Sequence, residues 1–262
     1  MVLPDDRSLA YWVILPTYCE ADNLPRLLEQ LKQPALDINI LIVDDNSPDG
    51  TGDIAALLEK ENPHIHLIRR ASKQGLGSAY LTGFVYALDA GADVVVTMDS
   101  DLSHDPWALS SLIAALDRAG CVVGSRYVAG GAIENWPVHR RVLSAAANRF
   151  VRVLFGMPVN DCTSGYRLYR RQVVEDILRN PPQSQGYSFI VEALFIAIRG
   201  PLSVREAPIR FVERISGTSK MGLREIIHGA WRLISLWAEI RLTNSIHMES
   251  AGENEKSGLD YT

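Results

Sequence analysis

Two aspartates, Asp99 and Asp101, stand one residue apart directly after the apolar run at 94–98. A run rich in β-branched residues is typical of a strand buried on both faces of a parallel sheet. In open α/β sheets, ligands bind beyond the carboxyl ends of such strands. Carboxylate oxygens at this spacing suit a divalent cation that bridges phosphate groups, and a solvated acidic loop is the alternative.

A second set of polar residues recurs at every fourth position, which places it on one face of a predicted helix: Arg140, Ser144, Asn148 and Arg152. The other face of that helix carries apolar residues: Leu143, Ala146, Phe150 and Leu154. An arginine fork matches phosphate oxygens in a bidentate way that lysine does not. We interpret the polar face as a phosphate site, although a solvated helix face gives the same pattern.

Length and composition indicate an ordinary globular protein. The 262 residues are enough for one large α/β domain, and 47% hydrophobic with 22% charged residues excludes disorder over most of the chain. Three scattered cysteines, Cys19, Cys121 and Cys162, lack metal-ligand spacing and predict free thiols in a reducing compartment. No signal peptide is expected, because no basic segment followed by an apolar core stands at the N-terminus.

Charge is unevenly distributed along the chain. Residues 1–120 carry 8 Lys+Arg against 18 Asp+Glu, a net charge of −10, whereas 121–241 carry 17 against 9, a net charge of +8. The remaining tail is −3, which gives the overall −5. An acidic half beside a basic half suits a reaction between two phosphorylated molecules, or docking on an anionic membrane. Solvated faces would produce a milder split.

The first 125 residues alternate strands and helices. We predict strands at 11–15, 38–43, 65–69, 94–98 and 121–124. The helices between them are expected after Asp22 or Asn23, at 54–60 behind Thr51 or Asp53, at 78–90 and at 106–119. The first helix has leucines at helical spacing: Leu24, Leu27, Leu28 and Leu31. Small residues in the third, Ala79 and Gly83, predict close packing. This alternation is typical of a nucleotide-binding α/β half.

Several familiar motifs are absent from the sequence. Gly75-Leu-Gly77 lacks the third glycine of a dinucleotide-binding loop, because Tyr80 occupies that position, and it follows the third predicted strand instead of the first. No P-loop, H-E-x-x-H or G-x-S-x-G sequence occurs. These absences remove dehydrogenases, Walker NTPases, zincins and elbow hydrolases as leading ideas.

Nine stretches of the sequence stand out: PTYCEADN, VDDNSPDGT, KQGLGSAY, MDSDLSHDP, GSRYVAGG, ENWPVHRRVLS, DCTSGYRLY, GYSFIVE and ERISGTSK. Together they resemble the inverting glycosyltransferase family 2, and within it the polyprenol (dolichol) phosphate mannose synthases. They occur in the family's order and cover 12–220. The resemblance implies a GT-A type, Rossmann-like α/β fold with a mostly parallel central sheet, a GDP-mannose donor, Mg²⁺ or Mn²⁺, and a polyprenyl or dolichyl phosphate acceptor.

The resemblance also assigns residues to the donor. It places five residues at the guanosine: Pro16, Tyr18, Glu20, Val43 and Asp45. Asp99, Ser100 and Asp101 would face the diphosphate and sugar. Relatives bind the metal through the second aspartate and a glutamine two residues later, which here correspond to Asp101 and Ser103, with Asp99 as a further candidate. Because a serine hydroxyl is a weaker ligand than a glutamine amide, the metal's identity stays open. Arg214 and Lys220 would form a mobile clamp over the donor phosphates.

The acceptor side follows in the same way. The resemblance brings Arg126 to the helical stripe, so that Arg126, Arg140 and Ser144 form the predicted phosphate cradle. A phosphate monoester, with a second pKa of about 6, is already an anion at neutral pH and needs no catalytic base. We therefore expect catalysis to depend on Asp101 with its metal, Arg126 and Arg214. The Q-x-x-R-W motif of processive relatives is missing, which favours a single transfer.

Residues 223–242 are the nearest approach to a membrane segment, but charged residues interrupt them. One helical face would carry apolar residues: Leu223, Ile226, Ile227, Ala230, Trp231, Ile234 and Trp237. The opposite face would carry His228, Arg232 and Glu239. This pattern predicts an interfacial helix lying on a membrane, and packing against the core is the alternative. The polar residues that follow predict a disordered tail at 243–262.

The sequence as a whole predicts one glycosyltransferase domain at 1–242, with a nucleotide-sugar half at 8–125, an acceptor half at 126–222 and the amphipathic helix at 223–242. Mannose transfer from GDP-mannose to a polyprenyl phosphate is the expected activity. Another sugar nucleotide such as UDP-glucose, or a non-catalytic sugar-nucleotide-binding subunit of a membrane complex, is the alternative. We expect a cytoplasmic protein, peripheral on the cytosolic face of a membrane, with room for a small membrane subunit and no nucleic-acid partner.

Overall fold

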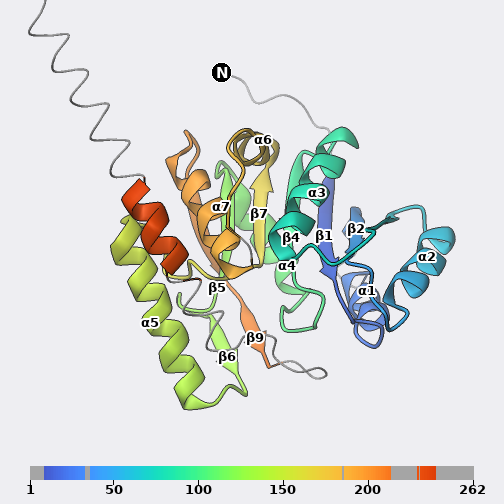
Figure 1. Ribbon diagram of the computed structural model, residues 1–262, viewed down its shortest axis with the longest axis horizontal. Helices are drawn as coiled ribbons and strands as arrows, with labels where there is room; N and C mark the ends of the chain where they lie inside the picture. The colour runs from blue at the N-terminus through green and yellow to red at the C-terminus, as the bar shows by residue number, and fades with distance from the viewer. Residues whose placement is uncertain (1–8, 33–35, 185, 214–228, 230, 240–262) are drawn as a thin grey trace, which may run out of the picture.

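The computed structural model describes residues 9–32, 36–184, 186–213, 229 and 231–239 (Figure 1). A seven-stranded sheet crosses the molecule, made of β1 (Tyr11–Thr17), β2 (Ile38–Asp44), β3 (Ile65–Arg69), β4 (Val94–Thr97), β5 (Cys121–Ser125), β7 (Arg167–Arg170) and β8 (Val204–Pro208). The strand order is β3-β2-β1-β4-β7-β5-β8. Only β7 runs antiparallel to its neighbours, so the predicted α/β class with a mostly parallel sheet is confirmed.

Helices cover both faces of this sheet (Figure 1). The helices are α1 (Leu24–Lys32), α2 (Thr51–Glu61), α3 (Leu76–Asp89), α4 (Ala108–Leu116), α6 (Arg171–Arg179) and α7 (Tyr187–Arg199), together with α5 (Val138–Phe155), which lies to one side of the sheet. A smaller sheet pairs β6 (Ala132–Glu134) with β9 (Arg210–Val212) in parallel. Residues 231–239 are also helical.

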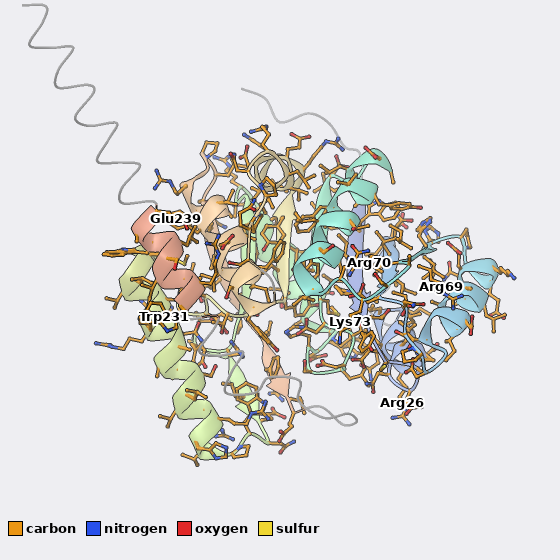
Figure 2. The ribbon with its side chains drawn as sticks, in the orientation of Figure 1. Arg26, Arg69, Arg70, Lys73, Trp231 and Glu239 are labelled. Atoms are coloured by element: carbon orange, nitrogen blue, oxygen red, sulfur yellow. The ribbon has the colours of Figure 1, made fainter. Side chains whose placement is uncertain are left out.

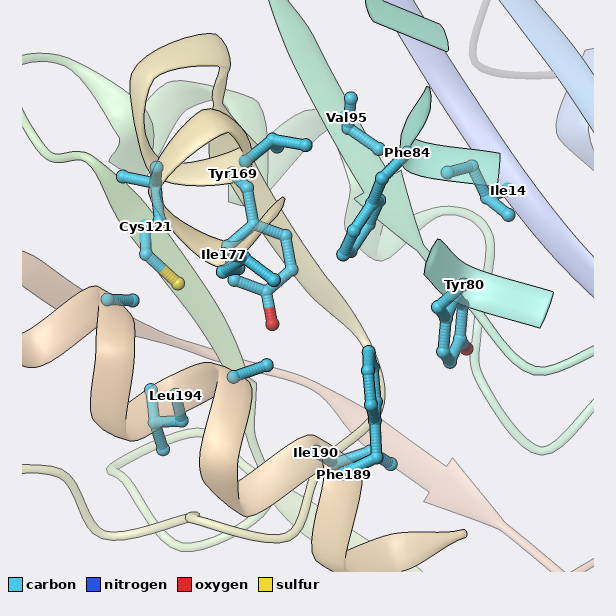
Figure 3. Close-up of a cluster of buried hydrophobic side chains, with 14 of the residues drawn as sticks. Ile14, Tyr80, Phe84, Val95, Cys121, Tyr169, Ile177, Phe189, Ile190 and Leu194 are labelled. Carbon is cyan, nitrogen blue, oxygen red and sulfur yellow. The ribbon is translucent and has the colours of Figure 1, made fainter. Parts of the chain in front are cut away.

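Two hydrophobic clusters hold the layers together, one on each face of the sheet. Because side chains alternate along a strand, β1 gives Ile14 to the cluster under α3 and α7, and Val13 to the cluster under α1 and α4. Figure 3 shows the first cluster, in which the ring of Tyr80 stacks on Phe189 with centroids 6.1 Å apart. A Cβ added to Gly83 would lie 2.6 Å from the Ile14 side chain, which confirms the predicted close packing of α3.

The five strands predicted in the first half match β1 to β5 to within two residues at each end. All four leucines of α1 are buried, as their spacing predicts. Helix ends were less accurate. The helix predicted at 54–60 begins three residues earlier, at Thr51, because Gly50 adopts a left-handed φ of 89°. Of the two residues expected to cap α1, Asp22 and Asn23, the second does not do so, because its buried Oδ1 accepts no hydrogen bond from the described residues.

The last described helix packs against α7. Arg232 Nε lies 3.8 Å from the buried carboxylate of Glu192, and Leu233 is buried in the cluster of Figure 3. Trp231 and Ile234 are exposed. Residues 223–228, 230 and the predicted tail at 243–262 lie outside the described residues. Within the described part of the chain, no helix combines the length and hydropathy needed to span a bilayer.

Candidate active site

The loop after β4 carries Asp99, Ser100 and Asp101 at the carboxyl edge of the parallel strands. Ser100 Oγ donates to the Pro16 carbonyl at 2.6 Å, which ties this loop to the end of β1. Asp101 Oδ1 accepts from the Ser103 N–H at 3.0 Å and from the Ser103 hydroxyl at 2.5 Å. Asp101 is only 3% exposed, so a loop of solvated acids does not describe it.

His104 organises the same loop, although the sequence analysis gave it no role. Its Nδ1 accepts from the Asp99 N–H at 3.2 Å, which leaves the ring proton on Nε2 when the ring is neutral. Burial lowers the pKa of His104, against the opposing effect of the Asp99 and Asp101 charges. His104 is therefore a neutral support for the loop, and the only sign of it in the sequence was its place in the stretch at 98–106.

Asp45 lies in a corner formed by the loop between β3 and α3. Its Oδ2 accepts from the N–H groups of Gln74 at 3.2 Å and Gly75 at 2.9 Å, and its carboxylate forms a buried ion pair with Arg70. The same loop carries Lys73, which is labelled in Figure 2. Lys73 Nζ lies 3.7 Å from the centroid of the Tyr18 ring. Arg70 was missed by the sequence analysis, because nothing in its spacing links it to Asp45.

The loop after β1 rests on the loop after β2. The N–H groups of Cys19 and Glu20 donate to Ser47 Oγ at 3.0 Å and Thr51 Oγ1 at 2.9 Å. Pro16, Tyr18, Glu20 and Asp45 therefore lie at adjoining strand ends, as predicted. Val43 differs from them, because its side chain is fully buried in the core and only its main chain could face a ligand.

On the acceptor side, Arg126 forms a buried bidentate ion pair with Asp161. Its Nε and Nη2 each donate to one Asp161 oxygen at 2.7 Å, and Nη2 also donates to Thr163 Oγ1 at 2.8 Å. Burial opposes both charges. The hydrogen bonds and charge of the partner outweigh it, so the pKa of Arg126 is raised and that of Asp161 is lowered. The sequence analysis did not identify Asp161 as the partner of Arg126.

The polar stripe of α5 faces the interior of this half. Asn148 is buried, where its Oδ1 accepts from the Cys162 and Thr163 N–H groups at 2.8 and 3.2 Å. Ser144 Oγ accepts from the Tyr127 hydroxyl at 2.8 Å. A solvated helix face is therefore the wrong description for the middle of the stripe. Its end at Arg152 is exposed.

Arg140, at the other end of the stripe, is paired with a carboxylate from β9's end. Its Nη1 donates to Glu213 Oε1 at 2.5 Å, and its guanidinium carbon lies 4.4 Å from the Trp136 ring centroid. Both side chains are about a third exposed, unlike the Arg126 pair. Each predicted acceptor arginine is thus neutralised by an acid within the chain.

Phe211 of β9 connects the two groups of residues. Its ring centroid lies 5.3 Å from the Arg126 guanidinium carbon and 5.2 Å from the His104 ring centroid. The Val212 N–H also donates to the Ser103 carbonyl at 3.1 Å. The aspartate loop and Arg126 therefore contact the same strand. Arg214 and Lys220, the predicted clamp, follow this strand but lie outside the described residues.

The oxygen donors around Asp101 suit a hard divalent cation in kind. Asp101 and Ser103 are hydrogen-bonded neighbours, and the Asp99 carboxylate, which is partly exposed, belongs to the same loop. Within the described ranges, no three His, Cys, Asp or Glu side chains are grouped to hold a metal ion. A cation held by so few protein ligands keeps several waters and takes further oxygens from substrate phosphates, as Mg²⁺ commonly does.

A family model and several known proteins match this chain. Residues 12–178 fit the model of the family "Glycosyl transferase family 2". The chain is 46% identical over 222 residues to a polyprenol monophosphomannose synthase of Mycolicibacterium smegmatis, covering 84% of this chain and 83% of that protein. It is 40% identical over 233 residues to an undecaprenyl-phosphate mannosyltransferase of Micrococcus luteus, covering 87% and 96%.

A solved structure also resembles the fold. Glucosyl-3-phosphoglycerate synthase from Mycobacterium tuberculosis, crystallised with Mn²⁺, UDP and phosphoglyceric acid, superposes with a TM-score of 0.63. That alignment covers 86% of this chain and 76% of the other, at 18% sequence identity. At this identity the likeness concerns the fold.

Proposed function

The chain belongs to glycosyltransferase family 2, and from that membership we propose that it transfers mannose from GDP-mannose to a polyprenyl or dolichyl monophosphate. The names of two relatives at 46% and 40% identity support the sugar and the acceptor class. The stretches at 16–23 and 43–51, which resemble those of the mannose synthases, support the guanosine diphosphate donor. Inversion at the anomeric carbon belongs to the same proposal.

The observation that carries this proposal is the shared contact on β9. Two substrates that both bear phosphate must meet with their reacting atoms in line, and positioning of this kind supplies much of the rate. The aspartate loop, through His104, and the acceptor arginine, Arg126, both lie against Phe211. One short strand therefore supports a donor-phosphate loop and a phosphate-binding arginine together.

The acceptor phosphate itself supplies the nucleophile. It attacks the anomeric carbon of the sugar, the bond from that carbon to the diphosphate oxygen breaks, and the diphosphate leaves with the electron pair. No proton has to be removed, because the monoester is already an anion at neutral pH. His104 has a lowered pKa, and its Nδ1 already accepts from the Asp99 N–H, so it holds the loop and takes no part as a base.

Binding and charge neutralisation are therefore the main tasks of the protein. Asp101, with Ser103 and Asp99, would hold Mg²⁺ or Mn²⁺, which when bound would neutralise charge on the donor diphosphate. Arg140 is exposed enough to exchange Glu213 for the acceptor phosphate. Arg126 would keep its ion pair with Asp161. It would contact the acceptor phosphate from that fixed position. Arg214 and Lys220 remain the proposed clamp on the leaving diphosphate.

The test is direct. Purified protein is incubated with a panel of labelled sugar nucleotides, Mg²⁺ or Mn²⁺, and a short polyprenyl phosphate in detergent. Transfer from GDP-mannose, with formation of a lipid-linked sugar, is the expected result. Transfer from UDP-glucose alone would replace the proposed donor, and donor binding without transfer would indicate a non-catalytic subunit. Activity in this purified system would also mean that no small membrane subunit is required.

We place the enzyme at the cytosolic face of a membrane as a peripheral protein. The acceptor class supports this placement, since a polyprenyl chain resides in a bilayer. Fractionation of cells that produce the tagged protein, followed by a wash with carbonate, would distinguish peripheral attachment from a freely diffusing protein.

A further inference from the structure

Tyr80, near the start of α3, brings a polar group into an apolar part of the core. The side chain is 1% exposed, and its ring stacks on Phe84 and Phe189 with centroids 6.3 and 6.1 Å apart (Figure 3). The Tyr80 hydroxyl has no hydrogen-bond partner anywhere in the described part of the chain. Burying a hydroxyl without a partner is unfavourable, so a folded protein that keeps one needs a reason for it.

Packing does not supply that reason. The other buried tyrosine of the cluster in Figure 3, Tyr169, has a partner, because Arg167 Nη1 donates to its hydroxyl at 3.2 Å. A phenylalanine at position 80 would keep both ring contacts and would leave no polar atom without a partner. The role of the Tyr80 hydroxyl therefore has to be sought in the neighbouring site.

The neighbouring site is the aspartate loop. Burial raises the pKa of Tyr80 well above its ordinary value, and the Asp99 charge raises it more than any other nearby charge does. The hydroxyl thus keeps its proton and can donate it in a hydrogen bond. Asp99 also approaches α7, because a Cβ added to Gly165 would lie 3.5 Å from both Asp99 Oδ1 and Ile190 Cδ1. Ile190 directly follows Phe189, so Tyr80 and Asp99 border the same end of α7.

The Asp99 carboxylate can turn while its main chain stays in place. The Asp99 N–H donates to His104 Nδ1 at 3.2 Å, which holds the backbone of the loop, and the Asp99 side chain is 24% exposed. A carboxylate that binds a cation through one oxygen is commonly hydrogen-bonded by a further protein group, which orients it. On the core side of Asp99, the Tyr80 hydroxyl is available for that bond.

We propose that Tyr80 is a positioning residue, whose hydroxyl donates a hydrogen bond to the Asp99 carboxylate when the cation and the donor diphosphate are bound. This inference deepens the proposed function and rests on its metal-dependent donor site. Because Tyr80 is buried, it touches neither substrate and acts through Asp99. The buried hydroxyl is then unfavourable in the folded chain alone, and the bond to Asp99 offsets that loss during the reaction.

Tyr80→Phe tests the proposal, because it removes only the hydroxyl, and Tyr166→Phe is the matched control. The Tyr166 hydroxyl is likewise buried and has no partner in the described ranges, but Tyr166 belongs to the cluster on the opposite face of the sheet, and the charge that affects its pKa is that of Asp105. Both variants should unfold at the urea midpoint of wild type or above it, since each loses a buried group without a partner. A lower midpoint for Tyr80→Phe would show that its hydroxyl is bonded in the folded protein, and would overturn the proposal.

Mn²⁺ binding in the presence of a nucleoside diphosphate is a measurement that a purely structural role would not change. In calorimetric titrations with GDP or UDP, Tyr80→Phe should need about ten- to a hundredfold more Mn²⁺ for half-saturation, and its kcat should fall by a factor in the same range. Tyr166→Phe should match wild type in both. In an Asp99→Ala background, Tyr80→Phe should cause no further change, because the acceptor of the bond is already gone. Wild-type Mn²⁺ affinity in Tyr80→Phe, or effects that multiply in the double variant, would contradict the proposed role.

Failure of this inference is distinguishable from failure of the proposed function, since the titration uses neither sugar nor lipid. A wild type that binds Mn²⁺ with a nucleoside diphosphate but transfers no mannose would refute the proposed function. The difference between Tyr80→Phe and Tyr166→Phe in Mn²⁺ affinity would still decide the role of Tyr80. A wild type without Mn²⁺-dependent binding of either GDP or UDP would refute both.

Discussion

The proposed donor edge and the proposed acceptor half of this molecule hold their charges in different ways. At the proposed donor edge, Asp101 accepts hydrogen bonds from the main-chain N–H and the hydroxyl of Ser103, two residues away in sequence. In the acceptor half, Arg126 and Arg140 are held by acids that are 35 and 73 positions distant. The Asp101 carboxylate is therefore positioned within its own loop, whereas the two arginines depend on segments that the folded chain brings together.

The two acceptor pairs differ from each other as well. The Arg126–Asp161 pair is buried and bidentate. Asp161 Oδ2 also accepts a hydrogen bond from the main-chain N–H of Arg126 at 3.0 Å. Removing one partner of such a pair leaves an uncompensated charge in a low-dielectric interior. The Arg140–Glu213 pair is partly exposed, and pairs of that kind contribute about 0–1 kcal/mol. We infer that the first pair holds Arg126 in a fixed position and that the second pair is available for exchange with a ligand.

The largest expected effect is on stability. Asp161→Ala should lower the free energy of unfolding by about 3–5 kcal/mol, because Arg126 would remain buried without a counter-charge. Urea denaturation followed by circular dichroism measures the change. Glu213→Ala is the matched control and should change the free energy of unfolding by no more than about 1 kcal/mol. Equal losses in the two variants would contradict the distinction between the pairs.

Activity should respond most strongly at the donor edge. Asp101→Asn should lower kcat by about two to three decades, the range seen when one preorganised electrostatic contact to a transition state is removed. Titration calorimetry should also show loss of the metal dependence of donor binding. Asp105→Asn is the control in the same loop. Asp105 accepts a hydrogen bond from the Trp107 N–H at 3.0 Å, and an asparagine oxygen can accept the same bond. Unchanged metal-dependent donor affinity in Asp101→Asn would remove Asp101 from the metal site.

The buried pair also predicts a pH dependence. The pKa of Asp161 is lowered in the folded protein from its ordinary 3.8, because Arg126 outweighs the effect of burial. The ionised carboxylate therefore contributes stability above pH 3.8, and that contribution is lost as the pH falls through the lowered pKa. The difference in unfolding free energy between wild type and Asp161→Asn should be constant from pH 7 to pH 5 and shrink below pH 3.8. A difference that grows in acid would show that the sign is wrong.

Much of the donor half could be predicted from the sequence, because its signals are local. The apolar runs at 38–43 and 94–98 are buried strands, and the leucines of α1 follow one helical face. The Asp99–Asp101 spacing places both acids at one strand end without knowledge of the rest of the fold. Helix ends were missed where a single backbone angle, such as that of Gly50, determined the start.

The acceptor half was less predictable for a physical reason. Asp161 and Glu213 pair with arginines that are distant in sequence, and no periodicity links such partners. Pattern analysis found the stripe Arg140, Ser144 and Asn148. It could not say which side of α5 faces the core, because the sequence pattern is the same whichever face is buried. The positions of Arg70 and His104 likewise depend on residues distant in sequence, Asp45 and Phe211.

The smallest expected effects separate Arg140 from its partner. In the folded protein the Arg140 guanidinium, which would bind the acceptor phosphate, donates a hydrogen bond to Glu213. The carboxylate and the phosphate would therefore compete for Arg140. Arg140→Ala removes a charge-assisted contact worth about 1.5–3 kcal/mol and should lower kcat/KM for the acceptor by roughly one to two decades. Glu213→Gln removes only the competitor and should lower the acceptor KM by about two- to fivefold, as expected for an exposed pair worth less than about 1 kcal/mol.

Opposite signs at the two ends of one ion pair are the decisive feature of this last prediction. Steady-state kinetics with a short polyprenyl phosphate, at saturating donor, measure both variants, and donor Kd by titration should stay within about twofold of wild type. Arg141→Ala is the control, because Arg141 is a neighbouring, exposed arginine on α5 outside the proposed cradle. If Glu213→Gln instead raises the acceptor KM, then Glu213 positions Arg140 for the phosphate and does not compete with it. A loss of donor affinity in Arg140→Ala would refute a separate acceptor cradle, because the two substrates would then share that arginine.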